Sequence, residues 1–208
     1  MLLRSHRCAR SGAGRLTEAK AAPRRLHITG ASGSGVSTLG AALAQRLACA
    51  HLDTDDFYWL PTDPPYRGIR ERSERLALLT AAMDAAPSGW VLSGSLDGWG
   101  DPLIPRFEQV IFLQAPTDLR LARLAERERL RNGAAIEPGG PLHAHHLDFM
   151  AYAAGYDTGV FTGVLTGRHL ARHEAWFAGL PCPVLRLDGA QTTKVLTEMV
   201  MAACKVGR

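Results

Sequence analysis

Residues 30–38 combine glycines and hydroxyl side chains in the spacing of a phosphate-binding loop. Gly30 and Gly35 frame four residues, and Ser37 follows two places later. This is the pattern G-x-x-x-x-G-K-S/T, except that Val36 stands at the lysine position. Glycine permits backbone angles that turn successive N–H groups toward an anion, and the helix that follows adds the positive end of its dipole. We expect the phosphates of a nucleotide to contact Gly30, Ala31, Ser32, Gly33, Ser34, Gly35, Val36, Ser37 and Thr38.

Three carboxylates follow a short apolar run that ends at Asp53. They belong to Asp53, Asp55 and Asp56, and Tyr58 stands two residues further along. Carboxylates beside phosphate can hold Mg²⁺ through water or accept a proton from an attacking hydroxyl group. We expect Ser37 and Asp53 to bind Mg²⁺, and Asp53 or Asp55 to orient the metal or the acceptor hydroxyl. The alternative is a turn in which Asp53 or Asp55 caps a helix.

Arginines in the segment 117–131 could supply the charge of the missing lysine. Their three- and four-residue spacing puts them on one face of a helix. A guanidinium group suits phosphate because its planar fork can hold two oxygens and stabilise charge in a loose transition state. The alternative is a solvated face whose charges are paired with Glu126 and Glu128. The arginines on this face are Arg120, Arg123, Arg127 and Arg131.

Two further segments could bind the acceptor of a phosphoryl group. Arg67 follows a proline-rich loop and suits an anionic acceptor, although a solvated loop explains it equally well. The loop 94–101 follows a predicted strand, and Asp97 and Trp99 are its candidates. The tryptophan could stack on a ring or pack at the surface. We expect acceptor contacts from Asp56, Tyr58, Arg67 and Asp97.

Alternating strands and helices position these segments. Apolar runs predict strands at 25–29, 50–53, 90–92, 110–113 and 183–187. Helical spacing predicts helices at 36–48, 71–85, 117–131, 142–155, 168–179 and 192–204. The alternation implies an α/β fold, with a five-stranded parallel sheet and helices on both faces. Ligands bind such sheets at the carboxyl ends of the strands, where the candidate loops begin.

Composition limits the number of domains and the kinds of partner that the chain is expected to have. The chain has 208 residues and is 46% hydrophobic, which suits one domain with a lid. Residues 1–25 carry seven basic residues and one acidic one, whereas residues 26–208 carry 17 basic and 19 acidic ones. We therefore expect residues 1–24 to form a disordered basic extension and the body, 25–208, to bind no nucleic acid. No apolar run approaches the ~18–20 residues of a membrane span, so no membrane partner is expected. Four scattered cysteines favour a cytoplasmic setting.

With these motifs the chain resembles the nucleoside and nucleotide kinases of the P-loop class over residues 25–204. Its Asp-Asp-Phe-Tyr run looks like the matching segment of uridine-kinase-like enzymes, and its loop is similar to the lysine-free loop of bacterial adenylate-kinase-like proteins. The resemblance implies ATP as donor, Mg²⁺ as metal, a small-molecule acceptor, a flap near 60–88 and a helical lid near 125–170. It also implies that lid arginines act on the transferring phosphoryl group, and Arg123 and Arg127 match that role best.

Two departures from the family pattern keep other functions open. Val36 replaces the lysine, and Ser93 follows the strand at 90–92 in a region where many relatives place an acid for the metal. The alternative to a kinase is a nucleotide-binding module without phosphoryl transfer, acting as a sensor or partner. The three neighbouring carboxylates favour an enzyme, because a pure binder does not need them beside phosphate.

A third function is that of an NAD(P)-binding dehydrogenase. Asp53 lies about where the ribose-binding acid of a dinucleotide site falls. The glycine spacing, however, fits neither G-x-G-x-x-G nor the short-chain dehydrogenase form. The chain also lacks the Tyr-x-x-x-Lys pair of the short-chain enzymes, since its three lysines are Lys20, Lys194 and Lys205.

Overall fold

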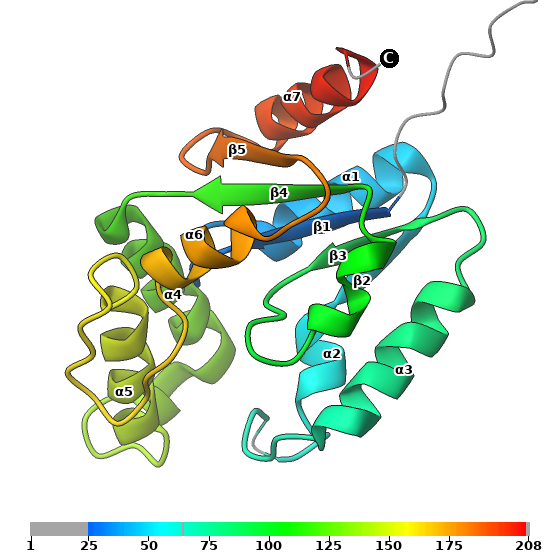
Figure 1. The fold of residues 1–208 in the computed structure, drawn as a ribbon. Coiled ribbons are helices and arrows are strands. Elements are labelled where there is room, and N and C mark those ends of the chain that lie inside the picture. The colour runs from blue at the N-terminus through cyan, green and yellow to red at the C-terminus, as the bar shows by residue number, and fades with distance from the viewer. Residues whose placement is uncertain (1–24, 64, 207–208) are drawn as a thin grey trace, which may run out of the picture.

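The computed structural model describes residues 25–206 apart from residue 64, so the expected extension at 1–24 lies outside the described residues. Five strands form one sheet in the order β2-β3-β1-β4-β5 (Figure 1). Every neighbouring pair is parallel, which confirms the predicted α/β fold with a five-stranded parallel sheet. The strands are β1 (Arg25–Gly30), β2 (Ala50–Asp53), β3 (Trp90–Ser93), β4 (Gln109–Gln114) and β5 (Val184–Asp188).

The described helices follow the predicted segments with three additions. The short helices α2, η1 and η2 were not predicted, because four to six residues are too few to show helical periodicity. The cap of α2 is Asp53, whose side chain accepts a hydrogen bond from the N–H group of Asp55. The helices are α1 (Val36–Leu47), α2 (Thr54–Tyr58), α3 (Arg72–Asp84), η1 (Asp101–Arg106), α4 (Thr117–Asn132), η2 (Gly133–Ile136), α5 (His143–Ala154), α6 (Leu170–Ala178) and α7 (Thr193–Val206).

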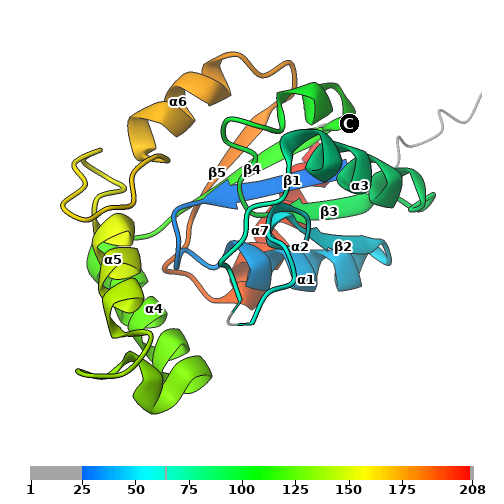
Figure 2. The same cartoon turned by 90° about the horizontal axis from the view of Figure 1, so that it is seen from below.

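Side chains that alternate along the strands pack into two cores, one on each face of the sheet. On the first face, Leu26 and Ile28 of β1 pack with α1 and α7. On the second, Val110 and Phe112 of β4 pack with α3, η1 and α6. Figure 2 shows α3 and α6 on one side of the strands and α1 on the other. Helices on both faces hold the sheet rigid and leave its carboxyl edge for the loops.

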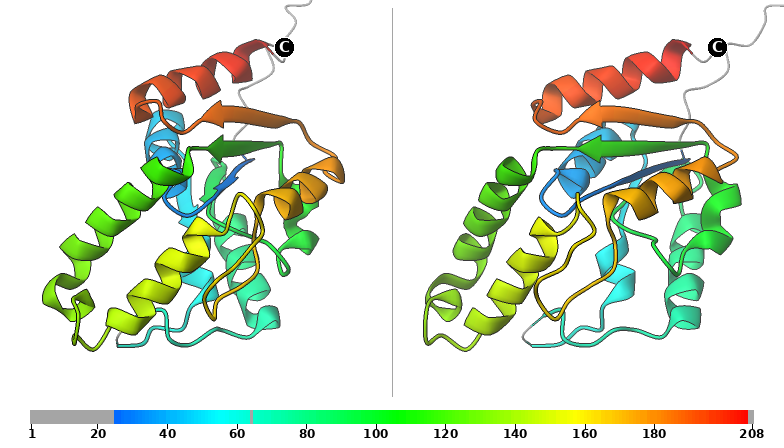
Figure 3. Two further views of the ribbon diagram at one scale, coloured as in Figure 1. Left: turned by 90° about the vertical axis from the view of Figure 1, so that its left-hand side faces the viewer. Right: turned by 60° about the vertical axis from the view of Figure 1, so that its left-hand side comes forward.

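Helices α4 and α5 lie side by side and project beyond the carboxyl end of β4 (Figure 3). The expected lid, 125–170, comprises the end of α4, η2, α5 and the segment that leads to α6. The expected flap, 60–88, contains α3. Their roles as lid and flap stay predictions. Within the described part of the chain, each helix is too short or too polar to pass through a bilayer.

Candidate functional site

The loop between β1 and α1 has a backbone suited to binding phosphate. Gly33 and Gly35 have φ values of 81° and 101°, in the left-handed region that favours glycine. A Cβ atom on Gly33 would also lie 2.5 Å from the carbonyl oxygen of Arg120, so the approach of α4 requires glycine there. Gly35 is the N-cap of α1, and no side chain caps this helix. The first-turn N–H groups of α1 therefore face no competing side-chain acceptor.

The side chain at the lysine position contributes to packing rather than charge. Val36 is half-buried and packs against the core that α1 and α7 form with the sheet. A valine keeps the helix and its N–H groups but supplies no positive charge. Any cationic side chain that acts on bound phosphate must therefore come from another part of the chain.

Ser37 and Asp53, the two predicted metal ligands, are in direct contact. The Ser37 hydroxyl donates to Oδ2 of Asp53 over 2.6 Å. The Ser93 hydroxyl donates to the same oxygen over 3.0 Å, and it lies 2.9 Å from Nε2 of His51. A hydroxyl and a carboxylate are oxygen ligands of the type that Mg²⁺ prefers. The described residues contain no group of three or more His, Cys, Asp or Glu side chains able to hold a metal. A metal ion here would thus draw its other ligands from water and phosphate.

Asp55 lies in the first turn of α2 and has a perturbed carboxyl group. Its side chain keeps contact with water, but partial desolvation raises its pKa and the charge of Asp53 raises it further. The positive charges of Arg168 and Arg127 partly offset this rise. Desolvation and Asp53 also raise the pKa of Asp56. A carboxylate such as that of Asp55, which is influenced by a negative charge and by positive charges, is suited to accept a proton.

The two arginines predicted to be catalytic contact different partners. Arg123 donates from Nη1 to the carbonyl oxygen of Gly189 over 2.9 Å. Arg127 is about half-exposed, and its Nη2 lies 3.4 Å from Oε1 of Glu128. Arg127 also acts electrostatically on Asp55. Of these two arginines, Arg127 is thus the one whose charge affects the carboxyl group of Asp55.

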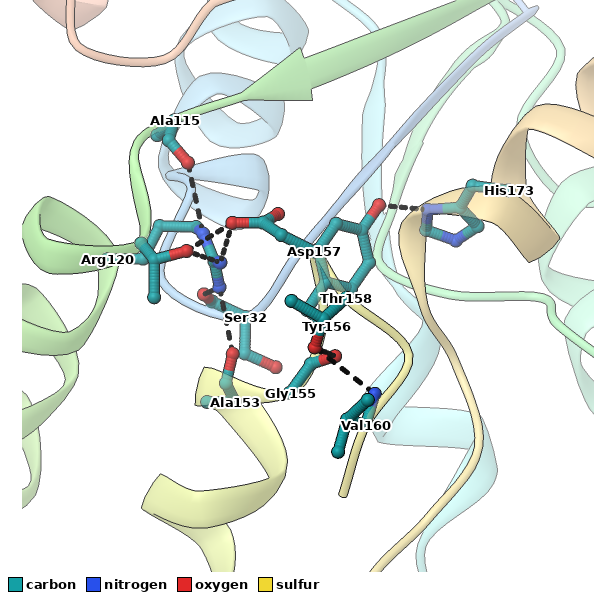
Figure 4. Close-up of polar contacts among 11 residues, drawn as sticks. Ser32, Ala115, Arg120, Ala153, Gly155, Tyr156, Asp157, Thr158, Val160 and His173 are labelled. Carbon is teal, nitrogen blue, oxygen red and sulfur yellow. Dashed lines mark hydrogen bonds and ion pairs between the residues drawn. The ribbon is translucent and has the colours of Figure 1, made fainter. Parts of the chain in front are cut away.

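Arg120 joins the phosphate loop, α4 and α5 in one hydrogen-bonded cluster (Figure 4). Its side chain is fully buried, so it does not lie on a solvated face. The guanidinium donates to the carbonyl oxygens of Ala115, Ala153 and Ser32 over 3.0, 3.1 and 3.5 Å. It also pairs with Oδ2 of Asp157 over 3.1 Å. These bonds occupy the guanidinium within the protein, which makes Arg120 a structural residue.

The predicted acceptor residues lie in α2, in the loop after β3 and in the expected flap. The guanidinium of Arg75 lies over the ring of Tyr58, 4.3 Å from its centre. Asp97 accepts a hydrogen bond from Nε of Arg172 over 2.6 Å, so its charge is paired. Arg67 is exposed. The role of these side chains in binding the acceptor stays a prediction.

Sequence reasoning missed one basic side chain at the phosphate loop. Arg168 donates from Nη2 to the hydroxyl of Ser32 over 3.3 Å, although 136 positions separate them in the chain. The segment 159–167 before it is irregular in structure and showed neither a motif nor helical spacing. Only the folded chain therefore brings this arginine to the loop.

A pocket of about 470 Å³ opens beside the phosphate loop. Its wall includes Ala31 of the loop, the carboxyl ends of β4 and β5, and Tyr156 with Asp157 after α5. This is the edge of a parallel sheet at which ligands bind. The pocket offers room for part of a ligand next to the candidate phosphate site.

Comparison with known proteins gives the following relationships. Residues 27–136 match the family described as AAA domain. The chain is 42% identical over 165 residues to Uncharacterized protein YqaC of Bacillus subtilis (strain 168), covering 79% of this chain and 88% of that protein. A shikimate kinase from Acinetobacter baumannii in complex with shikimate has a TM-score of 0.53 at 14% identity, covering 89% of this chain and 94% of that one. A gluconokinase from Sinorhizobium meliloti 1021 has a TM-score of 0.48 at 16% identity, covering 89% and 93% of the two chains.

Proposed function

Because the chain belongs to the AAA domain family and has the fold of P-loop kinases, we propose that it transfers the γ-phosphate of ATP to a small-molecule acceptor. The observation that carries this proposal is the 2.6 Å contact between Ser37 Oγ and Asp53 Oδ2. It lies where α1 begins, directly after the phosphate loop. A hydroxyl and a carboxylate at the head of a phosphate-binding helix are the side chains that a Mg²⁺-dependent phosphoryl transfer uses.

The residues present fit Mg-ATP. The positive φ angles of Gly33 and Gly35 turn the loop so that backbone N–H groups at the start of α1 are able to bind phosphate oxygens. Ser37 and Asp53 would hold Mg²⁺, which when bound neutralises charge on the phosphates. Asp55 would accept the proton of the acceptor hydroxyl. Its raised pKa favours proton uptake, and the charge of Arg127 favours its ionised form before transfer.

A nucleotide-binding module without phosphoryl transfer is the second candidate function. Val36 at the lysine position favours it, because its side chain packs in the core and adds no charge to the phosphate site. The Ser93 hydroxyl at the end of β3 favours it too, since it donates to Asp53 where a second acid could bind metal. Such a protein would bind ATP and release no ADP.

The fold argues against the dehydrogenase. In the dinucleotide-binding sheet β2 lies next to β1, so the acid at its end reaches the ribose. Here β3 lies between β1 and β2. Asp53 at the end of β2 is bonded to Ser37 of α1 instead.

Calorimetric titration with Mg-ATP tests the proposal, and NAD(P) is the parallel titrant. We expect ATP to bind and NAD(P) not to bind. Acceptors are then screened by ADP release. Binding of ATP with no ADP release from any hydroxyl compound would support the binding module, and binding of NAD(P) alone would restore the dehydrogenase.

Substitution of Asp53 separates catalysis from nucleotide binding. We expect Asp53→Ala to lower turnover about tenfold or more, because Mg²⁺ loses a ligand, while ATP still binds through the loop N–H groups. Glu198→Ala, which removes an exposed carboxylate of α7, is the matched control and should keep full turnover. Full turnover of Asp53→Ala would exclude Asp53 as a metal ligand.

A further inference from the structure

A cation at the phosphate site has to be supplied by a residue other than Val36. Charge spreads over the phosphoryl oxygens during transfer, and positive side chains stabilise it. The chain has 21 arginines and three lysines, so arginine is the side chain most able to take this place. Three of the α4 arginines that were candidates for this role already have partners. Arg120 binds carbonyl oxygens and Asp157, Arg123 binds a carbonyl oxygen, and Arg127 pairs with a glutamate.

Arg168 differs from these arginines in having no acidic partner. Its one hydrogen bond among the described residues goes from Nη2 to the Ser32 hydroxyl, a neutral group of the phosphate loop. Its Nε is sheltered from water and has no acceptor within the described residues. No ion pair in that part of the chain joins it to a carboxylate. An N–H donor removed from water without an acceptor is costly, so an anionic oxygen arriving at the loop would satisfy it.

The position of Arg168 also points to the site. Its Nη2 donates to the Ser32 hydroxyl of the phosphate loop. Its positive charge also counteracts the raised pKa of Tyr156, which follows α5. Arg168 therefore lies near both the loop and the segment after α5.

The residues that follow Arg168 are anchored to the segment after α5. The N–H group of Leu170 donates to the carbonyl oxygen of Tyr156 over 2.8 Å. The Tyr156 hydroxyl and Nδ1 of His173 form a buried hydrogen bond of 2.6 Å (Figure 4). These bonds fix the start of α6 against the end of α5. The arginine is thus held in place by the fold rather than by an acidic partner, which leaves its charge available.

We propose that Arg168 binds the β- and γ-phosphoryl oxygens and so takes the place of the missing loop lysine. The inference rests on the proposed function, since it assigns a residue to the same ATP site. A planar guanidinium can hold two oxygens at once, which a lysine cannot. The site would thus take its cation from the segment before α6 instead of from the phosphate loop.

The test measures binding of ATP, adenosine and inorganic tripolyphosphate by calorimetry to four proteins: wild type, Arg168→Gln, Arg168→Ala and Arg106→Gln. The matched control, Arg106, lies in η1 just before β4, at the amino edge of the sheet, and pairs with Asp84. We expect Arg168→Gln and Arg168→Ala to weaken ATP and tripolyphosphate about tenfold or more and to leave adenosine unchanged. We expect the control to match wild type for each ligand. Circular dichroism spectra verify that each variant is folded.

A rescue experiment distinguishes a phosphate contact from a structural effect. We expect Val36→Lys to strengthen ATP binding more in the Arg168→Gln background than in wild type, because only there is the cation missing. Equal effects in both backgrounds, unchanged ATP affinity of Arg168→Gln, or equal losses for ATP and adenosine would overturn the proposal for Arg168 alone. Failure of wild type to bind either ATP or tripolyphosphate would overturn the proposed function together with it.

Discussion

The two oxygens of Asp53 bind different partners. Oδ1 accepts the N–H group of Asp55 and so caps α2, while Oδ2 accepts the hydroxyls of Ser37 and Ser93. The two sequence interpretations of this residue, a helix cap and a metal ligand, are therefore compatible. The cap fixes the carboxylate in one orientation, and that orientation presents Oδ2 to the phosphate-binding helix. Replacement of Asp53 would change both the start of α2 and the site.

We expect the ionised carboxyl group of the neighbouring Asp55 to lower the free energy of unfolding at neutral pH. Its raised pKa means that the folded chain holds the proton more tightly than the unfolded chain does. Stability from this group is thus fully present below the ordinary pKa of aspartate and is lost as the pH rises through the raised value. We expect Asp55→Asn to raise the melting temperature at pH 7, since the amide has no charge to desolvate and none for Asp53 to repel.

The pH dependence of that gain identifies its cause. The advantage of Asp55→Asn should shrink on acidification and vanish below about pH 4, where aspartate is protonated in both states. Glu198→Gln on α7 removes one exposed carboxylate and is the comparison variant. A gain of Asp55→Asn that is the same at pH 4 and pH 7 would assign the effect to packing instead of charge.

Arg120 should contribute strongly to stability because its bonds have no substitute. Arg120→Met keeps the apolar stem but leaves the carbonyl oxygens of Ala115 and Ala153 without a donor. We expect a loss of about 2–4 kcal/mol in the free energy of unfolding, measured with urea. Arg129→Ala, which removes an exposed pair with Glu126, should cost under about 1 kcal/mol. Similar losses for the two variants would show that the Arg120 cluster adds little.

At the scale of elements, the phosphate loop and α4 depend on each other through Gly33. Its φ of 81° disfavours a side chain, and a Cβ atom at this position would lie 2.5 Å from the carbonyl oxygen of Arg120. Gly139 has a φ of 85°, but a Cβ there would meet nothing within 4 Å. We expect Gly139→Ala to cost about 1 kcal/mol from backbone strain alone. Gly33→Ala adds a backbone clash and should cost at least twice as much.

Urea unfolding and ATP titration of both variants check this prediction. Gly33→Ala should also weaken ATP binding, because the clash moves the loop N–H groups or α4. Gly139→Ala should lower stability only. If the two substitutions lower the free energy of unfolding equally, backbone strain from the positive φ explains both losses. The loop and α4 would then have room for a Cβ atom at position 33.

The sequence was sufficient to predict the five strands and the six longer helices. Each of these has a run of apolar residues or a helical period, which are local signals. The proximity of Asp53 to the phosphate loop was also predictable, since β1 and β2 end at the same edge of a parallel sheet, and the structure adds the contact between Asp53 and Ser37. The helices α2, η1 and η2 were missed because they are too short to show a periodic face. Arg168 was missed because its contact with Ser32 exists only in the folded chain.

At the scale of the whole molecule, two buried histidines lie where α6 covers the sheet, His27 on β1 and His173 on α6. His27 alternates with Leu26 and Ile28 along β1 and stacks on Phe107, with ring centres 5.1 Å apart. Burial lowers the pKa of His27 to about 4 and that of His173 to about 3. Both are therefore neutral in the folded protein near pH 7. Protonation of either histidine would place a charge in the apolar core on this face of the sheet. We therefore expect acid to destabilise this core before the one on the other face.

The expected consequence is a pH-dependent stability that His27 partly controls. The unfolded chain protonates this residue near its ordinary pKa of 6.5, whereas the folded chain does so only near 4. Stability present above pH 6.5 is thus lost as the pH falls, by up to about 1.4 kcal/mol per pH unit for one histidine.

His27→Leu fills a similar space and removes the Nε2 atom that has no partner among the described residues. Urea unfolding between pH 5 and 8 should give this variant a flatter profile than wild type, with the two differing least near pH 8 and most near pH 5. Parallel profiles would mean that His27 takes up its proton equally in both states.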